Sequence, residues 1–97
     1  MSSNGISSGL VRHNSEQQRF ELETSAGLAV AEYHREGDTL IVFFTEVPSA
    51  LHGRGIGKKL VRGLLDEVRQ SNLKVVPRCS FVAAFIQNHP EYRDLVA

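Results

Sequence analysis

The sequence predicts an α/β (α+β) domain in which a mixed, mainly antiparallel sheet is packed by about two helices. Three observations support this prediction. In the first half of the chain, apolar and polar residues alternate as they do in strands. An amphipathic helical pattern then follows an apolar run, and a short apolar segment comes after that helix. A strand, a helix and a returning strand form a crossover that makes the two strands parallel. The length of 97 residues, with 41% hydrophobic and 23% charged residues, fits one globular domain.

Composition and charge exclude several classes of protein. The formal net charge is zero and the pI is about 6.9, whereas a nucleic-acid-binding domain carries a basic excess. No apolar run approaches the roughly 20 residues that span a bilayer. Residues 1–9 have neither the basic start nor the apolar core of a signal peptide. We therefore expect no nucleic-acid partner, no membrane association and a cytoplasmic location.

The N-terminal segment is rich in Ser, Asn and Gly and offers almost nothing to bury. Such a composition is typical of disorder at a chain end. We expect residues 1–12 to be disordered and residues 13–97 to form the compact domain. The single cysteine, Cys79, excludes an intramolecular disulfide.

The first half of the chain predicts an antiparallel meander of three strands. Residues 19–24 alternate between apolar and charged side chains, as in a half-solvated strand. Turn signals then separate two further strands at residues 28–35 and 39–47. The continuous apolar run at 40–44 predicts that the third strand lies in the middle of the sheet and is covered on both faces.

The second half predicts a long helix, a short strand and a second helix. Residues 55–71 carry apolar side chains at helical spacing. Gly63 inside this helix costs about 1 kcal/mol relative to Ala, and a close contact with the sheet would explain it. Residues 73–76 return as a strand. Ser80 caps a second helix that ends near Asn88 and is built on Phe81, Val82, Phe85 and Ile86.

A glycine-rich turn at residues 47–59 joins the third strand to the long helix. The first amides of a helix lack internal partners and favour a phosphate oxygen, and Arg54, Lys58 and Lys59 add positive charge. The turn is not a Walker loop, because His52 and Lys59 replace its first Gly and its Ser or Thr. The turn also does not match the Gly-x-Gly-x-x-Gly fingerprint of dinucleotide-binding domains, because the third glycine of that pattern is absent. The alternative is a plain helix-start turn that binds nothing.

The six residues His52-Gly53-Arg54-Gly55-Ile56-Gly57 resemble the pyrophosphate loop of the GNAT superfamily of N-acetyltransferases, Gln/Arg-x-x-Gly-x-Gly/Ala. His52 departs from the first position of that pattern. Residues 74–86, with the Pro-x-Cys-Ser-Phe segment, and residues 89–92 are similar to a compact branch of the same superfamily. The resemblance extends from about Phe20 to Val96.

This resemblance implies that acetyl-coenzyme A is the acyl donor and that an amine attacks its thioester. Backbone N–H groups of the turn would hold the pyrophosphate, and the backbone at Val47 would contact the pantetheine or the thioester carbonyl. The residues expected to bind the coenzyme are Val47, His52, Gly53, Arg54, Gly55, Ile56, Gly57 and Lys58.

Two residues are candidates for catalysis. Cys79 precedes a helix start, where the helix dipole favours a thiolate. It would protonate the leaving thiolate, accept the acyl group as a nucleophile, or only pack. Glu46 ends the third strand and would act as a general base or remain a solvated carboxylate. Gln87 occupies the position of the tyrosine that many members use as general acid, and Tyr92 nearby suits packing better. No spacing of ligand residues suggests a metal site.

The acceptor site should be open. Larger members carry two helices after the first strand, and this chain has only Ser25-Ala26-Gly27 there. We expect an acetyl-CoA-dependent N-acetyltransferase-like protein that acts on an unidentified amine, with a protein or peptide as the suitable acceptor. The alternative is a non-catalytic CoA- or acyl-CoA-binding or protein-interaction module. The sequence predicts no oligomeric state.

Overall fold

The computed structural model describes residues 10–97. Its elements in chain order are β1 (Val11–Asn14), β2 (Arg19–Thr24), β3 (Gly27–Glu36), β4 (Thr39–Glu46), the 3-10 helix η2 (Ser49–Leu51), α1 (Ile56–Gln70), β5 (Lys74–Pro77), α2 (Ser80–Gln87) and the 3-10 helix η3 (Pro90–Leu95).

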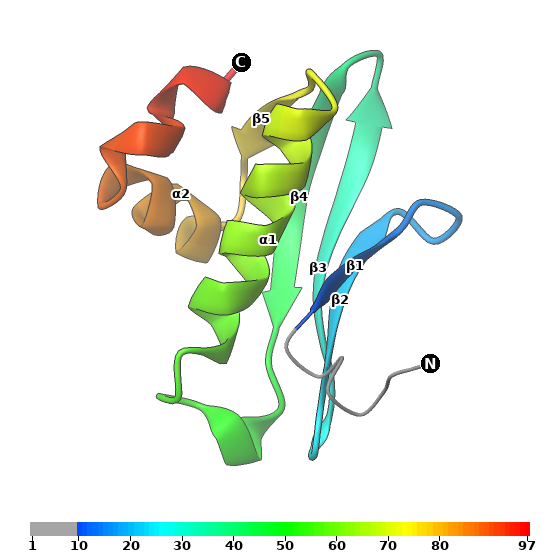
Figure 1. The fold of residues 1–97 in the computed structure, drawn as a ribbon, viewed down its shortest axis with the longest axis vertical. Coiled ribbons are helices and arrows are strands. Elements are labelled where there is room, and N and C mark those ends of the chain that lie inside the picture. The colour runs from blue at the N-terminus through cyan, green and yellow to red at the C-terminus, as the bar shows by residue number, and fades with distance from the viewer. Residues whose placement is uncertain (1–9) are drawn as a thin grey trace.

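Five strands form one sheet in the order β1-β2-β3-β4-β5. All neighbouring pairs are antiparallel except β4 and β5, which are parallel because α1 connects them as a crossover. Figure 1 shows β5 as a short strand beside β4, with α1 in front of the sheet. The predicted fold class and the parallel pair are confirmed. β4 pairs on both sides, as expected for the most apolar strand.

The first strand, β1, was not predicted. We expected residues 1–12 to be disordered, yet Val11 and Arg12 belong to β1, and residues 1–9 lie outside the described part of the chain. β1 is held by its side chains as well as by its pairing with β2. The His13 ring stacks on Phe20 with ring centroids 4.2 Å apart, and Val11 packs against the core. Four residues with one aliphatic side chain are too few for a periodicity to be recognised.

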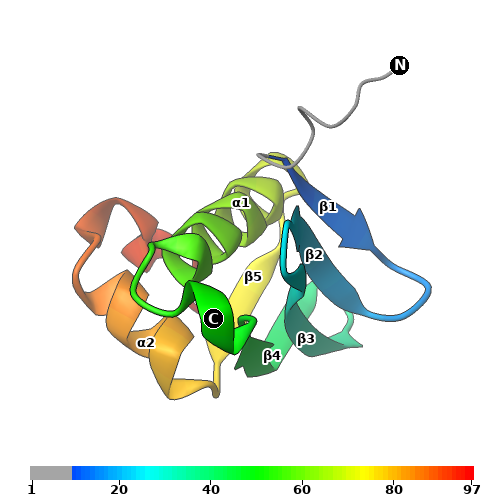
Figure 2. The ribbon, with the colours of Figure 1, turned by 90° about the horizontal axis from the view of Figure 1, so that it is seen from below.

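Both helices cover the same face of the curved sheet (Figure 2). The expectation that the third strand is covered on both faces is therefore wrong. In β4, Leu40 and Val42 are fully buried, but Phe43 and Phe44 are each 41% exposed. The register between β3 and β4 shifts at this point: Val42 pairs with Tyr33 and Phe44 pairs with Glu32, so Phe43 has no paired residue in β3. This irregularity turns two adjacent phenylalanines toward the uncovered face.

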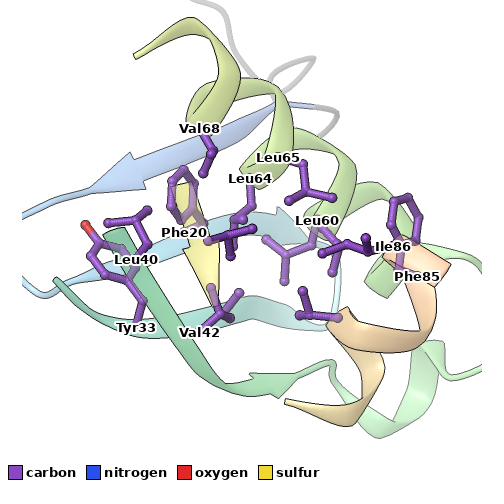
Figure 3. Packing of buried hydrophobic residues seen from close by; sticks show 14 of the residues in the cluster. Phe20, Tyr33, Leu40, Val42, Leu60, Leu64, Leu65, Val68, Phe85 and Ile86 are labelled. Atoms are coloured by element: carbon purple, nitrogen blue, oxygen red, sulfur yellow. The ribbon is translucent and has the colours of Figure 1, made fainter. Parts of the chain in front are cut away.

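The core lies between the sheet and the two helices (Figure 3). The helix α1 packs its apolar stripe against β1, β2, β3 and β5, as its helical spacing predicts. Ile56 at its start is partly buried, and the buried residues of the stripe are Leu60, Val61, Leu64, Leu65 and Val68. In α2, Val82, Phe85 and Ile86 are buried, but Phe81 is 41% exposed, which corrects its expected core position. The largest fully buried side chains are Phe20, Leu22, Leu40, Leu60, Leu64, Leu65, Val42, Val61, Val68, Val75 and Val82.

At Gly63, α1 lies in close contact with Val11 of β1, which confirms the contact expected for this glycine. A Cβ at Gly63 would lie 2.5 Å from both the Cβ and the Cγ2 of Val11. Contacts this short require the backbone of one element to move. Glycine therefore permits β1 to pack against the helix.

We predict that Gly63→Ala destabilises the protein by about 1–3 kcal/mol through overpacking, although Ala in a free helix is about 1 kcal/mol better than Gly. Denaturant unfolding measures the change. Val11→Ala removes two of the three close contacts, so the double variant should lose less stability than the two single changes added together. A stabilising Gly63→Ala would contradict this packing.

Glu21 is a buried carboxylate on the face of the sheet that the helices leave open. It is 4% exposed and accepts hydrogen bonds from Arg19 (2.7 Å), Arg12 (2.9 Å) and Asn14 (3.0 Å). The bonds from Arg19 and Asn14 lower the pKa of Glu21 more than burial raises it. A carboxylate with a lowered folded-state pKa stabilises the fold at any pH above its unfolded-state pKa.

We predict that Glu21→Gln lowers the free energy of unfolding by about 1–2 kcal/mol at neutral pH, because its charge-assisted hydrogen bonds are lost. The advantage of the native protein should shrink as the pH falls below the ordinary Glu pKa of about 4.5 and through the lower folded-state value. Glu23→Gln, an exposed position on the same strand, is the matched control. Parallel stability–pH curves for the native protein and Glu21→Gln would refute the assignment.

Candidate functional site

The site begins where β4 and β5 part. Their pairing ends at Val42 opposite Pro77, which has no amide hydrogen to donate. The Val42 carbonyl then accepts two hydrogen bonds, from the amides of Arg78 (2.9 Å) and Cys79 (3.0 Å). β4 continues to Glu46 with β3 as its partner. Within the described residues, the last part of β4 therefore has no strand on its β5 side.

The glycine-rich turn leads from the end of β4 into α1. Gly53 and Gly55 have φ values of 82° and 77°, in the left-handed region that favours glycine. The first α1 hydrogen bond runs from the Lys59 amide to the Gly55 carbonyl (3.0 Å), so the preceding amides of the first turn have no helical acceptor. Gly55 provides no side-chain cap, and the first turn of α1 contains no acidic residue. An anion would be stabilised at this helix start.

A cavity of about 400 Å³, which we call the glycine-loop pocket, lies at this helix start. Its walls come from the end of β4, the turn, the first residues of α1 and one residue of α2. The lining residues are Thr45, Val47, Leu51, His52, Gly53, Gly55, Ile56, Gly57, Lys58 and Phe81. Seven of the eight residues predicted to bind the coenzyme therefore line one pocket, and the eighth, Arg54, is exposed beside it.

Phe81 is a wall of this pocket that the sequence analysis assigned to the core. A Cβ at Gly57 would lie 2.8 Å from the Phe81 Cζ atom, so the ring occupies the space that Gly57 leaves open. Phe81 lies outside the buried triplet of Val82, Phe85 and Ile86. Its position outside this triplet is the one feature of the sequence that could have indicated that Phe81 is not a core residue. The indication is weak, because Phe81 also lies one helical turn before the buried Phe85.

His52 replaces the first residue of the resembled loop pattern, and the structure gives it a definite partner. Its Nε2 atom lies 2.9 Å from the Val47 carbonyl oxygen, to which the ring N–H donates. The imidazole thus bridges the turn back to the end of β4. This contact fixes the spacing between the two segments that form the pocket.

A second cavity, of about 620 Å³, lies across the end of β4 from the glycine-loop pocket. We call it the hairpin groove. It is bounded on one side by Ala26 in the β2–β3 turn and by Gly27 and Leu28 at the start of β3, and on the other side by residues 44–49 with His52. The two cavities share Thr45, Val47 and His52 as lining residues. Only this short segment separates them.

The two predicted catalytic residues lie on opposite sides of the end of β4. Glu46 is exposed and lines the hairpin groove. Cys79 is partly buried, and its Sγ atom lies 3.2 Å from the Thr45 Oγ1 atom, at hydrogen-bond distance. Cys79 is not a wall of either cavity, whereas Thr45 lines both. Sequence reasoning did not single out Thr45.

Tyr92 lies in the core, apart from these cavities. It is 6% exposed, its hydroxyl donates to Asp66 (2.8 Å), and burial raises its pKa. Residues 10–97 contain no group of three or more His, Cys, Asp or Glu placed to hold a metal. None of the helices in that range is both long and apolar enough to cross a bilayer.

The chain is similar to several known proteins. The relatives include Protein NATD1 of Danio rerio, 32% identical over 91 residues that cover 89% of this chain and 83% of that protein. Protein NATD1 of Mus musculus is 30% identical over 83 residues, covering 82% and 76%. The solution NMR structure of a GCN5-like protein from Staphylococcus aureus has the same fold, with a TM-score of 0.71, 24% identity, and 94% and 90% coverage.

A family match covers most of the described domain. The profile described as GCN5-related N-acetyl-transferase matches residues 19–95, which includes β2 to η3 and both cavities. The resemblance read from the glycine-rich turn is thereby confirmed. The chain belongs to the family of GCN5-related N-acetyltransferases.

Proposed function

We propose that this protein transfers an acetyl group from acetyl-coenzyme A to an amine. The observation that carries the proposal is the glycine-loop pocket, which joins an uncapped helix start to a strand end that has lost its neighbour. A coenzyme needs both features, one for its pyrophosphate and one for its amide-containing arm. Membership of the acetyltransferase family supports the same donor.

The pyrophosphate binds at the start of α1. The amides of Ile56, Gly57 and Lys58 precede the first helical hydrogen bond and point out of the helix. Gly53 and Gly55 have no side chain to obstruct a phosphate. Exposed Arg54, Lys58 and Lys59 are placed near the same end and add positive charge.

The pantetheine arm lies along the part of β4 that β5 leaves unpaired. Its amides would take the place of a neighbouring strand, because within residues 10–97 no strand pairs with β4 on that side beyond Val42. The thioester then reaches the end of the strand. There the Val47 amide is the candidate donor to the carbonyl oxygen as negative charge develops on it.

In the proposed reaction Glu46 takes a proton from the acceptor, and the amine nitrogen attacks the thioester carbon. A C–N bond forms, the C–S bond breaks, and the coenzyme leaves as a thiolate. Cys79 supplies a proton to this thiolate through the Thr45 hydroxyl, since Thr45 lines the pocket and Cys79 lies 3.2 Å behind it. The second amine proton passes to solvent, which also returns Cys79 and Glu46 to their starting forms.

We predict saturable acetyl-coenzyme A binding, followed by amide chemical shifts. The shifts should concentrate at Val47 and at residues 54–58. Gly55→Glu should abolish them, because it places a like charge against the pyrophosphate and a side chain at φ 77°. Gly37→Glu is the matched control, since Gly37 has φ 60° in a turn outside the glycine-loop pocket. Unchanged spectra at millimolar acetyl-coenzyme A would end the proposal.

We predict that Glu46→Gln lowers kcat/KM for amine acetylation by about 10²-fold or more, the usual range for a general base. Cys79→Ala and Thr45→Val should each lower kcat by a similar factor, whereas Cys79→Ser should retain more activity. Release of free thiol measures the rate, and mass spectrometry without acceptor tests for an acetyl adduct. A stable adduct on Cys79 would instead indicate a nucleophile, and coenzyme binding without turnover would indicate a binding module.

A further inference from the structure

A cavity of about 320 Å³ lies beside the middle of β3 and shares no lining residue with the two cavities described above. In the described chain, no residue of β2 pairs with β3 beyond Glu32. The turn that precedes β2 bounds the space left there, because the Gln18 carbonyl accepts the Tyr33 amide (3.0 Å). The cavity is lined by residues 16–18 of this turn, residues 32–34 of β3 and Phe43 of β4. We call it the aromatic notch.

Two lining side chains form an aromatic wall that is open to water. The rings of His34 and Phe43 stack with centroids 4.5 Å apart and an interplanar angle of 16°. Both residues are exposed, and Phe43 has no paired residue in β3 because the register shifts there. A cation is attracted to the face of an aromatic ring by the ring quadrupole. The wall is therefore a flat surface on which a planar cation can stack.

The charge of the notch is negative. Glu16 and Glu32 line it, and within residues 10–97 no Lys or Arg lines it and neither carboxylate forms an ion pair. Arg19 lies opposite Glu32 in the register, but its Nε atom donates to Glu21 at 2.7 Å. Two carboxylates beside an aromatic wall favour a cation and disfavour an anion of the same shape.

We propose that the aromatic notch is a docking site for an arginine side chain of a partner protein. A guanidinium is planar, stacks on aromatic rings and is more weakly hydrated than an ammonium. Its five N–H donors suit two carboxylates that come from different elements, the turn and β3. A lysine ammonium is a strongly hydrated point charge and gains less from the flat wall.

The same charges favour an arginine within a chain over free arginine. No described Lys or Arg lines the notch to pair with the α-carboxylate of a free amino acid. In a protein segment that charge is absent, because the carboxyl group forms a peptide bond. The notch therefore suits a partner protein, and this inference does not depend on the proposed acetyl transfer.

The test is a titration of the protein followed by amide chemical shifts, with Nα-acetylarginine amide as a probe without terminal charges. Saturable shifts are expected at residues 16–18, 32–34 and 43. The matching citrulline amide has the same shape without the charge and should bind at least about threefold more weakly. The matching lysine amide and free arginine should also bind more weakly. Equal binding of any of these three compounds, or shifts confined to other surfaces, would overturn the proposal.

Two matched pairs of variants locate the site. Phe43→Leu keeps an apolar side chain but removes the ring, and it should weaken binding of the arginine probe by about twofold to fivefold. Phe44→Leu should not, although Phe44 is equally exposed, because it does not line the notch. Glu32→Gln should weaken binding by about the same factor, and Glu36→Gln, on the same strand outside the notch, should not. Identical losses within either pair would mean that the notch is not the site.

The outcome is separable from that of the proposed function. Gly55→Glu, which should abolish acetyl-coenzyme A binding, should leave binding of the arginine probe unchanged. Loss of arginine binding in that variant would assign the probe to the glycine-loop pocket and overturn this proposal. Acetyl-coenzyme A turnover without arginine binding would refute the notch alone. Shifts at Phe43 that depend on protein concentration and not on the probe would instead assign this face to a second copy of the chain.

Discussion

The double hydrogen bond at the Val42 carbonyl is the contact on which the rest of the site depends. By accepting the amides of both Arg78 and Cys79, it ends the β4–β5 ladder and turns the chain away from the sheet. α2 begins at Ser80, directly after this turn. The same geometry places Cys79 against Thr45 and brings Phe81 to Gly57. Longer pairing of β5 would close the space that the pocket occupies.

Much of the fold could be predicted because its signals are local. The alternation in β2, the turn residues between strands and the apolar stripe of α1 each report on their own segment. The crossover follows from the order of the elements, not from any distant contact. The glycine turn was also predictable, since the left-handed conformations at Gly53 and Gly55 require the residue that the sequence has there.

The features that were missed depend on partners far along the chain. β1 is held by Phe20 and α1, so the four residues Val11–Asn14 carry little signal of their own. The exposure of Phe43 and Phe44 follows from a register shift against β3, which a continuous apolar run cannot indicate. Larger members of the family carry two helices after their first strand, and we expected Ser25-Ala26-Gly27 to replace them here. Because the first strand is β1, the turn that follows it is residues 15–18, which corrects that expectation.

The alternation of side chains along β4 places the proposed general acid and the proposed general base on opposite faces of the sheet. Thr45 pairs with Ala31 on the helix-covered face and contacts Cys79. Glu46, one residue later, pairs with Val30 and points to the uncovered face. Along the middle of a strand, groups on opposite faces are separated by the sheet itself. At the end of the strand this barrier stops, and an atom placed beside Val47 can be reached from both faces. A site that must protonate a leaving group and deprotonate a nucleophile is therefore best built where β4 ends.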